Sequence, residues 1–131
     1  MATRRDSSSA IFTRFWLPVI AYVTLISIVS HQPNLRPPIE YIFWIQADKV
    51  AHVLEYSILG LLLARVFRVS LAAPRALTLA LVSIGCGLGV AVLDEYHQSF
   101  VPGRDSSVYD VMADGVGLTV AQLVYRVAAR G

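Results

Sequence analysis

The sequence predicts an all-α fold: an integral membrane bundle of four antiparallel transmembrane helices, with both termini cytoplasmic. The 131 residues are 56% hydrophobic and only 15% charged. Their mean hydropathy of +0.59 is too high for an ordinary water-soluble domain. Four apolar stretches approach the roughly 20 residues that a membrane helix needs. None of them alternates between apolar and polar residues as a strand would.

The four expected spans cover residues 11–30, 49–67, 76–98 and 107–128 of a single membrane domain, 1–131. The connections between them contain helix-breaking residues. These are Pro33, Pro37 and Pro38 in the first connection, Pro74 in the second, and Pro102 and Gly103 in the third. Pro18 lies within the first span and predicts a kink there. Short connections make helices that are consecutive in the chain antiparallel.

The basic residues predict the orientation of the bundle. With four spans, both termini and the second connection share one side, which carries eight of the eleven Lys and Arg residues. Because basic segments stay in the cytoplasm, the other ends of the helices should face outward. The aromatic residues that precede the second span are expected at the lipid surface, or in a short re-entrant segment over residues 39–45.

Small residues are expected where helices approach one another closely. The Gly85-x-x-x-Gly89 spacing permits such a contact. Further glycines expected to serve this purpose are Gly60, Gly115 and Gly117. Cys86 has no partner for an internal disulfide and is expected to be a small buried packing residue.

Ionisable residues inside the apolar stretches are the strongest indication of function. They are costly in a membrane and face the bundle interior or water. Residues three or four apart share one helix face, so three spans each carry a polar stripe near the outer end. The stripes comprise Asp48, His52, Glu55 and Tyr56 on the second span, Asp94, Glu95 and Gln98 on the third, and Ser107, Asp110 and Asp114 on the fourth. We therefore predict one polar cavity that opens outward.

Lys49 and Arg104 are the cations expected near this cavity. When Asp105 is counted with the acids of the stripes, five negative charges stay unpaired if every group is ionised. Crowded carboxylates in a dehydrated site hold protons or attract a cation. A divalent cation, an amine-bearing ligand and general acid chemistry are therefore the options, alongside a purely structural network.

The residue types indicate which metal sites and nucleic-acid interfaces to expect. A magnesium-like site could be built from Asp94, Asp110 and Asp114. A structural zinc site is not expected, because one cysteine and scattered histidines lack the usual spacing. The basic residues are spread over the helix ends and make no nucleic-acid footprint.

Three blocks of residues carry a family resemblance. They are Asp48-Lys49-x-x-His52-x-x-x-Tyr56 with Gly60, Asp94-Glu95-x-x-Gln98 with Pro102-Gly103-Arg104, and Asp110-x-x-x-Asp114-x-x-Gly117. In order and spacing, residues 48–118 resemble the VanZ-like membrane protein family, named after a protein associated with teicoplanin resistance. The resemblance implies a helical protein of the bacterial cytoplasmic membrane, a role in the cell envelope, and working roles for the matched polar residues. It brings no agreed reaction.

The leading functional hypothesis is binding of an envelope component, lipid-linked or peptidoglycan-related, with a consequence for glycopeptide sensitivity. Arg104 would bind a phosphate or carboxylate through the paired N–H donors of its guanidinium group. The candidate ligand-binding residues are Asp48, Lys49, Tyr56, Asp94, Glu95, Gln98, Arg104, Asp110 and Asp114.

Two further hypotheses use the same fold differently. The first is a membrane-embedded acid/base or metal-assisted enzyme acting on a lipid-linked substrate, with Glu55 and His52 as the paired candidate catalytic residues. The second is an oligomeric scaffold or small transporter that associates through Gly85 and Gly89. The oligomeric state itself is not predicted.

Overall fold

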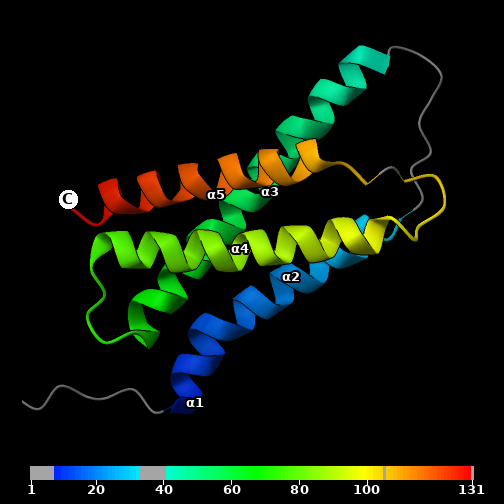
Figure 1. The fold of residues 1–131 in the computed structure, drawn as a ribbon. Helices are drawn as coiled ribbons and strands as arrows, with labels where there is room; N and C mark the ends of the chain where they lie inside the picture. The colour runs from blue at the N-terminus through cyan, green and yellow to red at the C-terminus, as the bar shows by residue number, and fades with distance from the viewer. Residues whose placement is uncertain (1–7, 33–40, 105, 131) are drawn as a thin grey trace, which may run out of the picture.

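The computed structural model describes residues 8–32, 41–104 and 106–130, and this part of the chain contains helices and no strand. The elements are α1 (Ser8–Ile11), the π-helical turn η1 (Phe12–Trp16), α2 (Leu17–Ser30), α3 (Tyr41–Ser70), α4 (Ala76–Gln98) and α5 (Val108–Ala128) (Figure 1). Four helical stretches are long and apolar enough to cross a membrane: Ser9–Ser30, Ala47–Ser70, Ala76–Gln98 and Val108–Ala128. The predicted all-helical fold with four spans is confirmed.

The first connection lies largely outside the described residues. The prolines expected to break the helix there, Pro33, Pro37 and Pro38, are among the residues left out. Residues 41–45, where a surface-lying or re-entrant segment was expected, continue α3 as helix. The helix therefore begins before the expected start of the span at residue 49.

Helices that are consecutive in the chain run in opposite directions (Figure 1). As a result α3 and α5 run in the same direction, and this parallel pair packs most extensively. Helix α4 packs against both of them, whereas α2 makes fewer contacts. The bundle is therefore built on α3 and α5, with α4 and α2 added to that pair.

The first span contains an irregularity at the turn before Pro18. The backbone N–H of Leu17 bonds to the carbonyl of Phe12, five residues earlier, as in a π-helix. Proline lacks an N–H, and its ring crowds the carbonyl four residues before it. A π-type turn is one of the local adjustments that accommodate a proline inside a membrane helix.

The distribution of side chains is the reverse of that in a water-soluble bundle. Some of the most exposed side chains are large and apolar, such as Leu77 (70% exposed) and Leu93 (69%). The buried polar and charged residues are Ser30, His52, Ser83, Asp94, Glu95, Gln98, Asp110, Asp114 and Gln122. Such an apolar surface would be unfavourable in water and is favourable in lipid.

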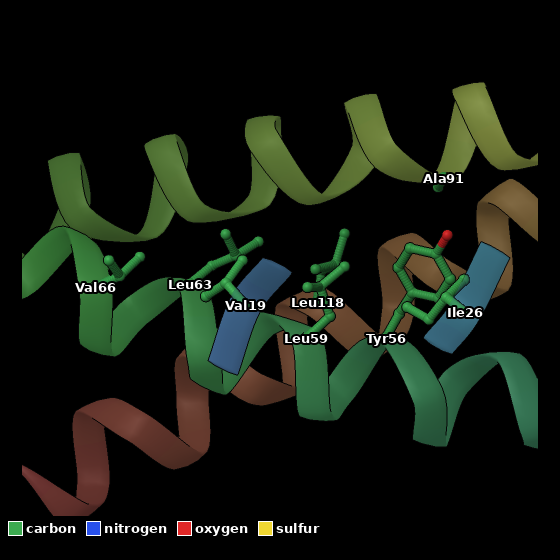
Figure 2. Packing of buried hydrophobic residues seen from close by; sticks show 8 residues of the cluster. All are labelled: Val19, Ile26, Tyr56, Leu59, Leu63, Val66, Ala91 and Leu118. Atoms are coloured by element: carbon green, nitrogen blue, oxygen red, sulfur yellow. The ribbon is translucent and has the colours of Figure 1, made fainter. Parts of the chain in front are cut away.

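A narrow apolar core occupies the space between the helices (Figure 2). Its buried members are Val19 and Ile26 from α2, Tyr56, Leu59, Leu63 and Val66 from α3, Ala91 from α4 and Leu118 from α5. Tyr56, Ile26 and Ala91 lie at one end of this core (Figure 2), and Tyr56 brings a hydroxyl group to that end.

The close approach of α3 and α5 depends on two glycines. Gly117 lies against the backbone carbonyl of Val53, so an added methyl group would overlap the α3 backbone. At Gly60 an added Cβ would lie 2.7 Å from the Cβ of Ala121. Ser57 Oγ lies 2.6 Å from the carbonyl oxygen of Val53 and 3.1 Å from that of Gly117. The roles predicted for Gly60 and Gly117 are confirmed.

The expectation for Gly85 and Gly89 is wrong within the chain. No heavy atom would lie within 4 Å of a Cβ at either position. Cys86, between them, is exposed rather than buried. This face of α4 points away from the bundle, and the contact with α5 is made instead at Gly87, which lies against Leu118. The Gly85–Gly89 face is left open for the contact between copies that the oligomer hypothesis requires.

We expect Gly117→Ala to destabilise the protein by about 1 to 3 kcal/mol, because the new methyl group must push α3 away from α5. Gly85→Ala is the matched control. There the same methyl group enters open space, and the change should be neutral or stabilising by up to about 1 kcal/mol. Unfolding of the purified variants in detergent measures the difference. Equal stability of the two variants would contradict the close contact.

Candidate functional site

The polar stripes of α3, α4 and α5 meet at the end of the bundle where α4 ends and α5 begins (Figure 1). We refer to these residues as the polar cluster. It comprises Ser30, Asp48, Lys49, His52, Tyr56, Asp94, Glu95, Gln98, Asp110 and Asp114. The contacts described below join its members across helices. The predicted convergence of three stripes on one end is therefore present in the structure.

His52 and Asp114 join α3 to α5. His52 Nδ1 lies 2.8 Å from Asp114 Oδ1, and His52 Nε2 lies 3.9 Å from Asp110 Oδ1. The Asp114 side chain is only 1% exposed. An ionised Asp114 carboxylate can only accept, and in that state it orients the imidazole with a proton on Nδ1. His52 Nε2 is then the nitrogen that is available to another group.

Lys49 provides the positive charge of this part of the cluster. Its ammonium group contacts the Asp110 carboxylate, and its Nζ lies 3.6 Å from Asp48 Oδ2. Asp110 also lies in the first turn of α5, where the helix dipole favours a negative charge. Lys49 therefore bridges the adjacent acid on its own helix and an acid on α5.

A divalent cation finds a partial ligand set here. Asp48, His52 and Asp110 are the three described residues whose ligand atoms all lie within 4.8 Å of one another. Carboxylate and imidazole groups are suitable ligands. The Lys49 ammonium, however, already contacts Asp110 and supplies a positive charge at that position. Asp94 and Asp114, the other ligands expected with Asp110, do not join this group.

The acids of α4 have one satisfied and one unsatisfied oxygen each. Asp94 Oδ2 accepts hydrogen bonds from Ser30 Oγ at 2.7 Å and from Gln98 Nε2 at 2.9 Å. Glu95 Oε2 accepts the backbone N–H of Ser107, the N-cap residue of α5, at 2.7 Å. Asp94 Oδ1 and Glu95 Oε1 are buried and have no hydrogen-bond partner within the described part of the protein.

The hydroxyl group of Tyr56 is also buried and has no hydrogen-bond partner among the described residues. Figure 2 shows it pointing from α3 toward α4, close to Ala91. Asp94 and Glu95 follow Ala91 by about one helical turn. Buried polar atoms are nearly always hydrogen-bonded, so three unsatisfied groups in one region indicate a place for a polar ligand.

Arg104 has a role that the sequence did not reveal. Val101 to Arg104 form a tight turn, in which the Arg104 N–H donates to the Val101 carbonyl at 3.1 Å and Gly103 has a φ of 79°. The turn directs the guanidinium group to α2. Nε donates to the Gln32 carbonyl and Nη2 to the Val29 carbonyl, each at 3.2 Å. Arg104 thereby satisfies carbonyl groups at the C-terminal end of α2.

Glu55 is half-buried, and its carboxylate forms no hydrogen bond with a described residue. Its backbone carbonyl accepts the hydroxyl of Tyr22 at 3.1 Å, which ties α2 to α3. The sequence suggested Glu55 as the partner of His52. In the structure the hydrogen-bonded partner of His52 is Asp114.

The contribution of α2 was not anticipated from the sequence. Ser30, the last residue of α2, is buried and hydrogen-bonded to Asp94. Just outside the cluster, His31 Nδ1 lies 3.1 Å from His97 Nε2. The signal in the sequence was the pair Ser30 and His31, two polar residues at the end of a mostly apolar span.

Four apolar helices around a buried polar cluster define a multi-pass integral membrane protein, for which the lipid bilayer is the solvent. The chain belongs to the VanZ/LLP1 family, whose model matches residues 3–129. This match confirms the resemblance seen in the three sequence blocks and extends it over the first span and the C-terminal part. No curated protein and no solved structure matches the chain.

The ion pair between Lys49 and Asp110 can be tested with a double-mutant cycle. We expect Lys49→Met to cost about 1 to 3 kcal/mol of unfolding free energy, because it leaves a buried carboxylate without its cation. Asp110→Asn should cost less, since Lys49 is 31% exposed and can be solvated. The double variant should be more stable than the sum of the single effects allows. Additive effects in detergent unfolding would show that the pair is not coupled.

Proposed function

We propose that the polar cluster binds the polar head of a lipid-linked or peptidoglycan-related component of the cell envelope. The observation that carries the proposal is the set of buried, unsatisfied atoms Asp94 Oδ1, Glu95 Oε1 and Tyr56 Oη. Each such group costs about 1 to 3 kcal/mol when no partner is present. A ligand with hydroxyl, amide or ammonium donors offsets that cost. Sugars and amino acids supply these donors.

A lipid-linked ligand fits the position of the cluster. The acids belong to helices that cross the membrane, and the surrounding outer surface is apolar. A ligand anchored by its own lipid chain holds its polar head at this depth without crossing bulk water. Arg104 also supports a lipid-linked ligand. Its Nη1 forms no hydrogen bond with a described residue and can bind a phosphate.

The proposed site faces the extracytoplasmic side of a bacterial cytoplasmic membrane. Lys49 and Arg104 are the described Lys and Arg residues at the end with the polar cluster. The opposite end carries Arg14, Arg65, Arg68, Arg75, Arg126 and Arg130. This imbalance favours cytoplasmic termini. Binding of a cell-wall precursor from outside would change its exposure to glycopeptides, which supplies a link to the resistance associated with the family's namesake.

Two probes distinguish binding of the sugar from binding of the diphosphate. One is a polyprenyl diphosphate that carries an N-acetylhexosamine, and the other is the same polyprenyl diphosphate without the sugar. We expect the first to bind the purified protein in nanodiscs more tightly. Glu95→Gln should weaken binding of the sugar-bearing probe roughly tenfold or more, because hydrogen bonds to charged groups contribute about 1.5 to 3 kcal/mol. Arg104→Ala should weaken both probes equally, because it addresses the phosphate.

Arg75→Gln is the control, since it removes one charge at the opposite end of the bundle. Thermal unfolding of each variant checks that α2 stays in place when Arg104 is changed. Binding of both probes that survives Arg104→Ala and Glu95→Gln unchanged would overturn the proposal.

A second candidate function is acid/base catalysis on the same class of lipid-linked molecule. The hydrogen bond between His52 Nδ1 and Asp114 Oδ1 favours it, because an aspartate that orients an imidazole is a common general-base arrangement. His52 Nε2 would take a proton from the attacking group. Asp94 Oδ1 and Glu95 Oε1 would then orient the substrate.

We expect His52→Gln to lower turnover of the sugar-bearing probe by about 10² to 10⁴-fold while its binding changes little. Glu55→Gln tests the other of the two catalytic candidates that the sequence indicated and should have the smaller effect, since its carboxylate forms no hydrogen bond with His52. Product formation followed over time, with and without added Mg²⁺, is the measurement. Absence of turnover by the unaltered protein in both conditions would leave binding alone.

A further inference from the structure

A cavity lies at the end of the bundle opposite the polar cluster, where α4 begins and α5 ends. Its volume is about 410 Å³. Three arginines line it: Arg68 from α3, Arg126 from α5, and Arg130, which lies in the turn after α5. Leu77, Leu79 and Leu123 contribute apolar walls. We propose that this cavity binds the phosphate headgroup of an anionic phospholipid.

Among the described residues, no carboxylate pairs with the arginines of the cavity. None of the three arginines forms an ion pair or a side-chain hydrogen bond within the described part of the chain. The described acidic residues all belong to the region of the polar cluster and Glu55, at the other end. A guanidinium group offers paired donors that match a phosphate. Three such groups at one cavity therefore favour an anion.

The surface of α5 that leads away from the arginines is suited to an acyl chain. Val116, Thr119, Leu123 and Arg126 are three or four residues apart and so lie on one face of the helix. Val116 and Thr119 also line a shallow hollow of about 360 Å³, together with Met112, Gly115 and Val120. The apolar surface thus continues from the arginines along α5.

The length of this surface matches one leaflet. From Arg126 to Val116 the helix rises about 15 Å, which is half of the roughly 30 Å hydrocarbon core. A phospholipid whose phosphate lies between the arginines therefore places an acyl chain along α5 as far as the middle of the bilayer. A free phosphate would make no use of this apolar surface, so the ligand is an amphiphile.

A second copy of the chain is a poorer occupant. Copies inserted in the same membrane have the same orientation, so the arginines of one copy meet the arginines of the next. The described carboxylates that could pair with them lie at the opposite end of the bundle. Charge complementarity therefore selects an anionic lipid.

The test is native mass spectrometry of delipidated protein in detergent, titrated with phosphatidylglycerol or phosphatidylcholine of identical acyl chains. We expect phosphatidylglycerol to bind at least about tenfold more tightly. The triple variant R68Q/R126Q/R130Q should lose roughly a hundredfold in affinity for it, because each arginine at a lipid surface changes binding about fivefold. Excess glycerol phosphate, which has the headgroup without the chains, should not displace the lipid.

The matched control is R14Q/R65Q/R75Q, which removes three arginines at the same end that do not line the cavity. It should keep the preference for phosphatidylglycerol. Ala76→Trp keeps all the arginines and fills the cavity, and it should lower affinity as well. Equal binding of the two lipids, equal losses in both triple variants, or lipid binding unaffected by Ala76→Trp would each overturn the proposal. The probes of the polar cluster serve as a separate readout, because this cavity is independent of that site.

Discussion

The contact between α3 and α5 at Gly117 determines the geometry of the polar cluster. Val53, whose carbonyl meets Gly117, follows His52 in α3, and Asp114 precedes Gly117 by about one turn in α5. A larger residue at 117 would separate the helices at the level where His52 Nδ1 now lies 2.8 Å from Asp114 Oδ1. The spacing Asp110-x-x-x-Asp114-x-x-Gly117 thus places two acids and the contact residue along one face of α5.

In lipid, packing of small residues and polar contacts hold helices together, because burial of apolar surface gives little net gain. Several polar contacts serve this purpose, including Gln122 Nε2 to the Gly60 carbonyl at 3.1 Å and Ser30 Oγ to Asp94 Oδ2. A structural network accounts for groups whose hydrogen bonds are complete. It does not account for Asp94 Oδ1 and Glu95 Oε1, which are buried, have no partner among the described residues and form the basis of the proposed ligand site.

Local patterns were sufficient to predict the four spans and the inward position of the acids, because hydrophobic length and helical phase are properties of single segments. They failed at Gly85 and Gly89, because residues 84–93 of α4 are apolar on every face and glycine spacing alone does not tell which face meets α5. The contacts of Arg104 with Val29 and Gln32 could not be predicted from local patterns either. They join residues far apart in the sequence and depend on the turn at Gly103.

The parallel arrangement of α3 and α5 explains why acids and arginines lie at opposite ends. Parallel helices place their positive N-terminal ends toward the same end of the bundle, where negative charge is favourable. Asp110 in the first turn of α5 and the Glu95 carboxylate on the Ser107 N–H provide that charge. At the other end Arg68 and Arg126 lie in the last turns of α3 and α5. One helix pair thus carries a cluster of carboxylates at one end and an arginine-lined cavity at the other.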